Sequence, residues 1–189
     1  MTIAEWDERY RARREDPARE APPADLVAET AARLAPGRAL DLACGAGRNA
    51  IWLAAKGWKV TAVDGSQAAV DILRRRASAH SLVLSTAVAD LEADEFPIEA
   101  AKWDLIVSAY YLQRGLFERI RAGVRPGGVA IVIAHTVACG EEPSAHRLRP
   151  GELRAYFSGW ALLHDYEGVP RDAEHQRAVA EIAARRPEN

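Results

Sequence analysis

The sequence is poor in the residues that hold disulfide-rich or zinc-stabilised proteins together. Only two of its 189 residues are cysteines, Cys44 and Cys139, and they form no Cys-x-x-Cys pair. Because disulfide frameworks and structural zinc sites need several closely spaced cysteines or histidines, we expect neither, and no metal site. Cysteine use of this kind is typical of a reducing compartment and favours a cytoplasmic location.

Long apolar runs and an excess of one charge are also missing. No segment approaches the roughly 20 apolar residues that span a bilayer, and the N-terminal stretch MTIAEWDERYRARRE has no apolar core typical of a signal peptide. Lysine and arginine number 25 against 27 acidic residues, a net charge of -2. Since nucleic-acid binders usually carry a basic surface, we expect no nucleic-acid partner and no membrane partner.

What the sequence does contain is an alternation of β-rich and helical segments. Helical patterns cover residues 4–16, 26–34, 47–57, 67–79 and 116–128. A Pro-Gly turn is expected to end the last of these helices. Most of them alternate with five β-rich segments: 38–43, 58–64, 82–90, 103–112 and 129–135. This alternation predicts an α/β protein with a parallel sheet covered by helices on both faces. Segments 160–169 and 177–186 predict an antiparallel hairpin at the sheet edge.

The stretch ALDLACGAGRNA, residues 39–50, follows the first predicted strand. Gly45 and Gly47 permit backbone angles and a close ligand approach that a Cβ atom would block. The helix that begins near Gly47 directs free N–H groups at a ligand and favours an anion. Asp64 ends the second predicted strand about twenty residues further on, where a carboxylate can bind both hydroxyls of an adenosine ribose.

Two ligand classes fit this glycine turn. The spacing G-x-G-x-x-A followed by an acid is compatible with a nicotinamide dinucleotide, so an NAD-dependent oxidoreductase stays an alternative. Asp41 argues against it, because a carboxylate at the mouth of a pyrophosphate pocket repels phosphate and attracts an ammonium group. S-adenosylmethionine combines adenosine, a carboxylate, an ammonium group and a sulfonium. We therefore expect S-adenosylmethionine as the cofactor.

Five segments in this order, LDLACGAGRNA, VTAVDGS, VADLEADEFP, WDLIVSAYYL and VRPGGVAIVI, resemble the motifs of class I S-adenosylmethionine-dependent methyltransferases. GELRAYFSGW and the closing hairpin are similar to the small tellurite-resistance and thiopurine methyltransferase branch. The resemblance implies a doubly wound, mostly parallel seven-stranded sheet of order 3-2-1-4-5-7-6 with the last strand antiparallel. It also implies an N-terminal lid helix and linker over residues 1–21 and a methyltransferase domain over residues 22–189.

The same resemblance implies roles for residues around the glycine turn. Asp41, Gly45 and Gly47 would hold the methionine portion of the cofactor, and Asp64 would bind the ribose hydroxyls. The usual first motif has glycine where Ala43 stands, a change that we read as tolerated. Without the resemblance, Asp64 in the sequence DGS would be a turn residue.

Further implied roles lie on other segments. Asp90 would accept a hydrogen bond from the adenine amino group, and Leu91 would offer its backbone N–H to the ring. Tyr110 would line the pocket near the sulfonium, while Tyr10 and Arg14 would lie over the cofactor in the lid helix. On composition alone, Asp90 would belong to a solvated acidic loop.

The acceptor side is less defined. Tyr110 and Tyr111, with one facing the core and one the pocket, and His135 at the end of the fifth strand are the substrate-side candidates, although His135 could equally be a capped core histidine. No catalytic dyad stands out. Methyl transfer by in-line displacement depends mainly on positioning, and a base is needed only for an acceptor that is protonated at rest. We expect a small-molecule acceptor such as a thiol or chalcogen oxyanion; a non-catalytic S-adenosylmethionine-binding regulatory protein is the other alternative.

Overall fold

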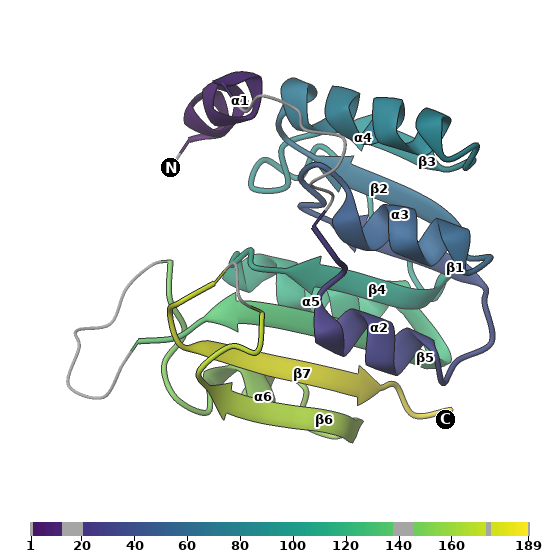
Figure 1. Cartoon of the computed structure of the whole chain (residues 1–189). Helices are drawn as coiled ribbons and strands as arrows, with labels where there is room; N and C mark the ends of the chain where they lie inside the picture. Colours follow the sequence, from purple (N-terminus) through teal and green to yellow (C-terminus); the bar gives the residue numbers. More distant parts are fainter. Residues whose placement is uncertain (1, 13–20, 138–145, 173–174, 189) are drawn as a thin grey trace.

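A seven-stranded sheet forms the centre of the computed structural model, which describes residues 2–12, 21–137, 146–172 and 175–188 (Figure 1). The strand order is β3-β2-β1-β4-β5-β7-β6, which confirms the expected topology. All neighbours from β3 to β5 are parallel, and β7 runs antiparallel to both β5 and β6. The strands are β1 (Arg38–Leu42), β2 (Lys59–Asp64), β3 (Ser85–Val88), β4 (Trp103–Ala109), β5 (Val124–His135), β6 (Ala161–Gly168) and β7 (Val179–Arg185).

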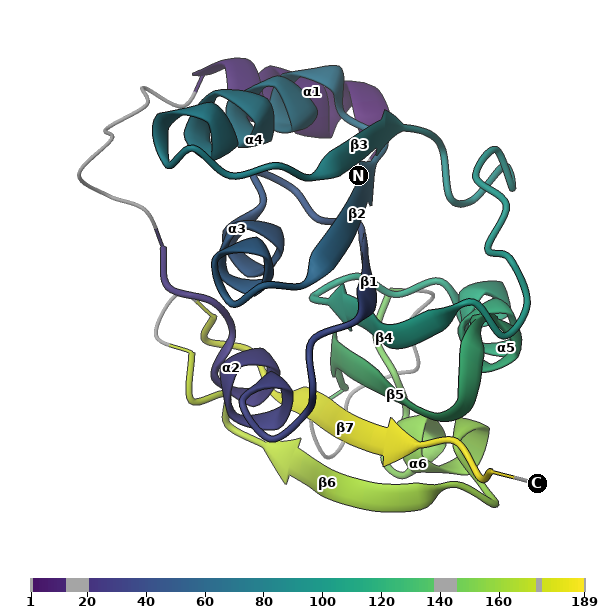
Figure 2. The same ribbon diagram turned by 90° about the vertical axis from the view of Figure 1, so that its right-hand side faces the viewer.

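Helices cover both faces of this sheet, as Figure 2 shows most clearly. Residues of α2, α3 and α4 join one apolar cluster, and residues of α5 and α6 join the other. In β4, Leu105 and Val107 belong to the first cluster and Ile106 to the second, which explains why the strand is apolar throughout. The helices are α1 (Ile3–Ala12), α2 (Asp25–Ala31), α3 (Arg48–Ala55), α4 (Gln67–Ala79), α5 (Arg114–Gly123) and α6 (Glu152–Tyr156).

The parallel register brings the ends of several strands to one edge. Asp41 pairs with Ala62 of β2 and with Val107 of β4, so the last residues of β1, β2 and β4 lie side by side. β5 continues this edge to His135. Ligands of doubly wound sheets bind at the carboxyl ends of such strands, and this edge therefore positions the site.

The expectation that Pro126-Gly127 ends the fifth helix as a turn is wrong. α5 ends at Gly123, and both residues lie within the span of β5. The pairing of β4 with β5 shifts register between Trp103 and Leu105, and such an irregularity accommodates a proline that cannot donate a ladder hydrogen bond. Gly127 adopts φ 74° there and donates its N–H to the carbonyl of Arg186 at 3.0 Å.

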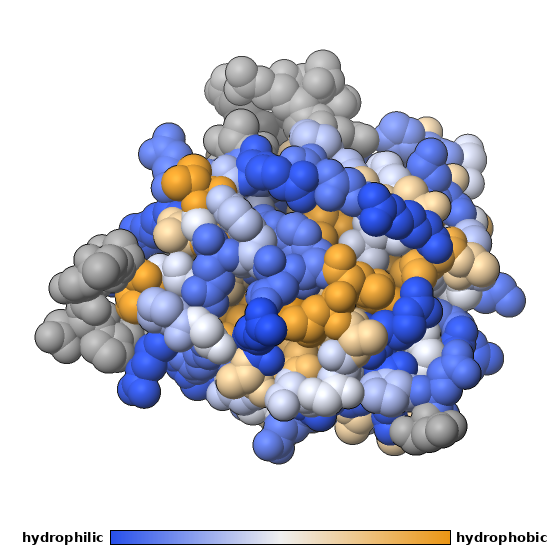
Figure 3. Space-filling model, turned by 90° about the horizontal axis from the view of Figure 1, so that it is seen from below, coloured by the Kyte–Doolittle hydropathy of each residue, from blue (hydrophilic) through white to orange (hydrophobic). Residues whose placement is uncertain are grey.

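β6 is the outermost strand on one side of the sheet, at the bottom of Figure 1. Its Leu163 and Tyr166 are exposed, but Asp165 and Glu167 on the same strand are charged. Charged side chains on an edge strand oppose pairing with another chain. Figure 3, seen from this side, shows apolar patches bordered by hydrophilic residues. Across the described part of the chain, no helix is long and apolar enough to cross a membrane.

Candidate active site

The turn after β1 has an unusual backbone. Ala43, Gly45 and Gly47 adopt φ angles of 52°, 54° and 84°, in the left-handed region. A Cβ atom on Gly45 would collide with the Tyr10 hydroxyl, and one on Gly47 would collide with Leu73 of α4. Glycine is therefore required at both positions. The φ of Ala43 also explains why glycine is usual there, since an L-residue in this region costs about 1–2 kcal/mol.

Asp41 is the buried acid of this turn, with 1% of its surface exposed. A backbone hydrogen bond from Ala50 reaches its carboxyl, but Oδ2 has no hydrogen-bond partner among the described residues. Burial raises the pKa of Asp41 to about 7, and the nearby carboxylate of Asp64 contributes, against the Ala50 bond and the positive charge of Arg48. A buried, unpaired carboxyl oxygen favours a ligand that brings a cation or a hydrogen-bond donor.

Asp64 is held at the end of β2 by two backbone N–H groups. Gly45 donates to Oδ2 and Ser66 donates to Oδ1, each at 2.8 Å. Burial raises the pKa of Asp64, while these two bonds oppose the rise. Each carboxylate oxygen has a second lone pair, so Asp64 can still accept hydrogen bonds from a ligand in a fixed orientation.

The loop after β3 lies next to this carboxylate, because Ala89 donates its N–H to the carbonyl of Asp64 at 3.0 Å. Asp90 follows and accepts the N–H of Glu92 at 2.8 Å in a local turn. Leu91 is buried, with 4% exposed. The structure thus places Asp64, Asp90 and Leu91 close together, and their roles toward a cofactor stay predictions. Tyr111 lies on the same side. Burial raises the pKa of its phenol, and the nearby charges of Glu92, Asp90 and Asp64 raise it further.

Helix α1 docks on this region through Asp7. Asp7 Oδ1 accepts hydrogen bonds from Ser66 Oγ at 2.7 Å and from the N–H of Ala68 at 2.8 Å, at the start of α4. The Ala68 and Ser66 bonds hold the pKa of Asp7 below its usual value. This contact places Tyr10 over Gly45. Arg14, the other expected lid residue, lies outside the described residues.

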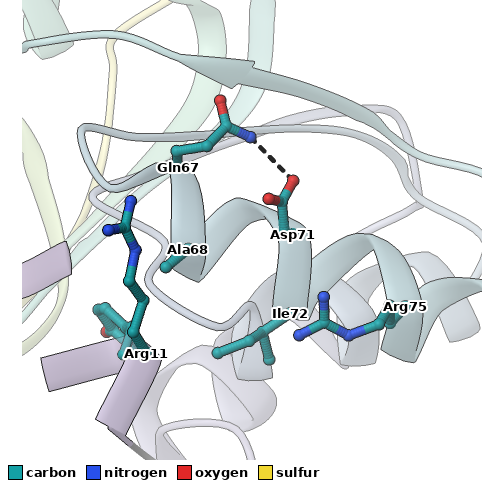
Figure 4. A pocket seen from close by; sticks show the side chains of 7 residues that line it. Arg11, Gln67, Ala68, Asp71, Ile72 and Arg75 are labelled. Carbon is teal, nitrogen blue, oxygen red and sulfur yellow. Dashed lines mark hydrogen bonds between the residues drawn. The ribbon is translucent and has the colours of Figure 1, made fainter. Parts of the chain in front are cut away.

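A cleft with a volume of about 390 Å³ lies between α1 and α4 (Figure 4). Tyr10 and Arg11 line it from α1, and Ala68, Ile72 and Arg75 line it from α4. Gln67 and Asp71 are hydrogen-bonded at its rim, 2.8 Å apart. Tyr10 lines this cleft and its hydroxyl also lies against Gly45, so the cleft adjoins the candidate cofactor site, and Asp41, Asp64 and Asp90 are not among its lining residues.

The other side of the site is built around Tyr110, which has φ 62° directly after β4. Its ring stacks on His175 with centres 3.4 Å apart and planes 3° from parallel. Its hydroxyl donates to Asp172 Oδ2 at 3.0 Å, and Arg48 pairs with the same oxygen at 2.7 Å. Tyr110 and Tyr111 thus point to opposite clusters, the former to that of α2 and α3 and the latter to that of α5 and α6. The rings of Tyr110 and His135 have centres 5.8 Å apart.

Sequence reasoning missed three residues of this arrangement: Asp7, Arg48 and Asp172. Arg48 directly follows Gly47, so its place at the start of a helix facing the site was visible in the sequence. Asp172 is 124 residues from Arg48 and 62 from Tyr110 along the chain, and no local pattern marks it. Asp7 carries no signal either, because its partners belong to α4.

The geometry also bears on two other kinds of site, a reactive cysteine and a metal site. Burial, together with the charges of Asp41 and Asp64, raises the pKa of Cys44 well above its usual value. The thiol therefore stays protonated, and a reactive thiolate is disfavoured. Within the described ranges, no cluster of three or more histidine, cysteine, aspartate or glutamate residues could hold a metal ion.

Comparison with known families decides among the remaining possibilities. The sequence model of the family described as "Tellurite resistance protein TehB" matches residues 19–178. This chain belongs to the TehB family. The match includes every expected cofactor residue except those of the N-terminal helix. The family and the fold place it among the class I S-adenosylmethionine-dependent methyltransferases.

Two curated relatives of this TehB-family chain show how far the similarity extends. A "Probable S-adenosyl-L-methionine-dependent methyltransferase TehB" of Haemophilus influenzae is 27% identical over 154 residues, which cover 76% of this chain and 52% of the relative. "Hemagglutinin 1" of Eikenella corrodens is 32% identical over 157 residues, 76% of this chain and 50% of the relative. The chain thus spans about half the length of these curated relatives.

Among solved structures, the crystal structure of TehB from Haemophilus influenzae superimposes with a TM-score of 0.72 at 26% identity. The superposition covers 85% of this chain and 61% of the Haemophilus influenzae chain. A structure described as "Conversion of a Disulfide Bond into a Thioacetal Group during Echinomycin Biosynthesis" superimposes with a TM-score of 0.70 at 23% identity and covers 99% of this chain and 94% of that chain. This second likeness supports the fold alone.

Proposed function

We propose that this chain transfers the methyl group of S-adenosylmethionine to a small-molecule acceptor. The observation that carries the proposal is the unpaired, buried Oδ2 of Asp41 beside a turn made bare by Gly45 and Gly47. An ammonium group completes the hydrogen bonding of this oxygen, whereas the pyrophosphate of a dinucleotide would be repelled by it. The membership of the TehB family supports the same assignment.

The cofactor side then has a role for each expected residue. Asp41 accepts hydrogen bonds from the ammonium group, and the Gly45–Gly47 backbone lies against the methionine portion. Asp64, fixed by Gly45 and Ser66, binds the two ribose hydroxyls. When bound, S-adenosylmethionine supplies an electrophilic methyl group on a positively charged sulfur.

The adenine and the lid complete this side. Asp90 accepts a hydrogen bond from the adenine amino group, and the Leu91 backbone N–H bonds the ring. Tyr111, which lies near Asp90 and Asp64, stays a substrate-side candidate. Residues 1–21 form a lid and linker over a methyltransferase domain of residues 22–189, with Tyr10 closing over Gly45. The Asp7 contact with the start of α4 supports this lid.

On the acceptor side, Tyr110 lies near the sulfonium and orients the acceptor in line with the sulfur–methyl bond. Alignment of the two partners and exclusion of water lower the barrier by about 7–11 kcal/mol in favourable cases. The acceptor classes that we propose are a thiol, a chalcogen oxyanion or a similar small nucleophile. Tyr110 is held by Asp172 and His175, so the wall of the acceptor pocket is rigid.

The test is a methyl-transfer assay with isotopically labelled S-adenosylmethionine on a panel of thiols, selenols, metalloid oxyanions and phenols. We expect labelled product and S-adenosylhomocysteine in equal amounts for at least one class, and loss of both in Asp64→Ala. Tight cofactor binding without turnover on any class would instead indicate a non-catalytic S-adenosylmethionine-binding protein.

A further inference from the structure

His135 is the last residue of β5, at the edge of the sheet where the carboxyl ends of the parallel strands meet. Its ring is centred 5.8 Å from the ring of Tyr110 and 5.5 Å from that of His175. The backbone fixes this neighbourhood, because Tyr110 donates its N–H to the carbonyl of Ile133 at 2.7 Å. His135 is therefore on the opposite side of Tyr110's strand from the cofactor turn, which follows β1.

Nδ1 of His135 is buried and has no hydrogen-bond partner among the described residues. The backbone groups of Ala178 and Arg177 lie close to the same ring. In a neutral imidazole that is protonated at Nε2, Nδ1 carries a lone pair that can accept a proton. A buried acceptor without a partner is unfavourable, so a native site that keeps one calls for a functional explanation.

The charges around His135 favour this neutral form. Burial lowers the pKa of His135, and the positive charges of Arg177 and Arg147 lower it further, against the backbone hydrogen bonds. Arg147 is brought close because its neighbour Leu148 donates its N–H to the carbonyl of His135 at 2.8 Å.

Among the described residues, two further ionisable side chains pack beside this ring from other segments. Tyr110, after β4, stays protonated because burial and Asp172 raise the pKa of its phenol. His175, from the segment before β7, packs against both rings. Asp172 is paired with Arg48, which balances its charge. Nδ1 is thus buried beside the rings of Tyr110 and His175, with a lone pair that can act as a base.

From this arrangement we infer that His135 Nδ1 accepts the proton of the methyl acceptor, and that the acceptor is a hydroxyl or thiol compound that is protonated at rest. The inference rests on the proposed methyltransferase function and narrows its acceptor class. A metalloid oxyanion presents lone pairs, and Nδ1 presents one as well, so the two cannot form a hydrogen bond. Such an acceptor would need a hydrogen-bond donor in place of Nδ1.

The step balances in atoms and charge. The proton of the O–H or S–H group passes to Nδ1 while the freed lone pair of oxygen or sulfur forms a bond to the methyl carbon. The methyl–sulfur bond breaks, and its electron pair returns to the sulfur, so the positive charge of the sulfonium reappears on the imidazolium. A general base of this kind contributes about 10²- to 10⁴-fold.

The test compares wild-type protein and His135→Gln on two matched acceptors, phenol, which is protonated at neutral pH, and a nitro-substituted thiophenol, which is already ionised. We expect kcat for phenol to fall about 10²- to 10⁴-fold in the variant, with kcat for the thiophenol and the Kd of S-adenosylhomocysteine unchanged. His164→Gln, whose parent ring pairs with Glu181 at 3.0 Å on β6 and β7, serves as the control and should behave as wild type. Equal losses on both acceptors, or no loss on phenol, would overturn the inference.

A second measurement decides the matter without turnover. Long-range ¹H–¹⁵N spectra of the imidazole nitrogens should show a neutral His135 protonated at Nε2 at pH 7, and phenol should shift the Nδ1 resonance when S-adenosylhomocysteine is present. An Nδ1–H tautomer, a charged ring, or an Nδ1 resonance indifferent to phenol overturns the role of His135. Failure of the proposed function is seen separately, as wild-type protein that turns over no acceptor.

Discussion

The two sides of the site are assembled differently. On the cofactor side, Gly45 and Asp64 are 19 residues apart and joined through a backbone N–H. On the side where we propose that the acceptor binds, Arg48 and Asp172 are 124 residues apart and joined through side chains. The first arrangement depends on local backbone geometry, and the second depends on how the β6–β7 segment folds back. Cofactor binding should therefore tolerate few substitutions, whereas acceptor choice can change with a few side chains.

The largest expected effect is a loss of cofactor affinity from a substitution on the cofactor side of the site. Asp64→Ala removes charge-assisted hydrogen bonds to the ribose worth about 2–4 kcal/mol, so the Kd of S-adenosylhomocysteine should rise roughly 30- to 700-fold. Calorimetric titration measures it. Asp71→Ala, an acid on the nearby surface of α4, should leave the Kd unchanged. Equal binding by Asp64→Ala and wild type would remove Asp64 from the site.

Asp172→Ala should impair catalysis through the proposed acceptor side of the site and leave cofactor binding intact. Without Asp172, Tyr110 and Arg48 lose the carboxylate that holds them, and misplacement of about 1 Å can cost 10²-fold in rate. We expect acceptor kcat/KM to fall about 10- to 100-fold and the cofactor Kd to stay within about threefold of wild type. Glu29→Gln, which loosens the neighbouring Arg171 on the outer surface, is the control. A parallel loss of cofactor affinity would show that the two sides are not separate.

The pH dependence of cofactor affinity sharpens the comparison. Because the pKa of Asp41 is about 7 before binding, an ammonium ligand must displace a proton below that pH. Affinity should fall about tenfold for each pH unit below 7 and level off above it. Calorimetry in buffers of different ionisation enthalpy should detect about one proton released per ligand at pH 6, and none in Asp41→Asn.

The same raised pKa has a consequence for folding. Between the ordinary value of 3.8 and about 7, the folded chain holds the Asp41 proton more tightly than the unfolded chain does. This group therefore favours folding at low pH, and its contribution is lost as the pH rises through about 7. The bound ammonium group of the cofactor should restore stability above that pH.

A smaller effect is expected at the lid. Asp7→Ala removes two hydrogen bonds at the start of α4, a contact worth about 1 kcal/mol by analogy with helix caps. The Kd of S-adenosylhomocysteine should rise about fivefold, and its release in stopped-flow measurements should speed up by a similar factor. Glu8→Ala on the same helix should change neither. Unchanged release from Asp7→Ala would show that α1 does not close over the cofactor.

The smallest expected effect lies in the turn itself. Ala43→Gly relieves the strain of φ 52°, about 1–2 kcal/mol, against an entropy cost of about 0.5–1 kcal/mol for glycine. Denaturant unfolding should show stabilisation of up to about 1.5 kcal/mol with cofactor affinity unchanged. Destabilisation would mean that the methyl group of Ala43 makes packing contacts that outweigh the strain.

Much of the cofactor side could be predicted because its signals are local. Ser66 directly precedes α4, and its hydroxyl accepts the N–H of Ala69 at 3.1 Å, a capping role typical of serine at a helix start. The glycines follow from backbone geometry, and the strand order came with the resemblance to a known family. The Pro126-Gly127 prediction failed because a register shift between β4 and β5 outweighs the ordinary turn preference. Asp7 and Asp172 act through distant segments, which no local pattern reveals.

The most direct test of the central claim is calorimetric titration of the wild-type protein with S-adenosylhomocysteine and, separately, with NADH. A turn that holds a zwitterionic adenosyl ligand should bind S-adenosylhomocysteine at one site per chain and give no saturable heat with NADH. Saturable binding of NADH, together with no binding heat from S-adenosylhomocysteine, would contradict the account.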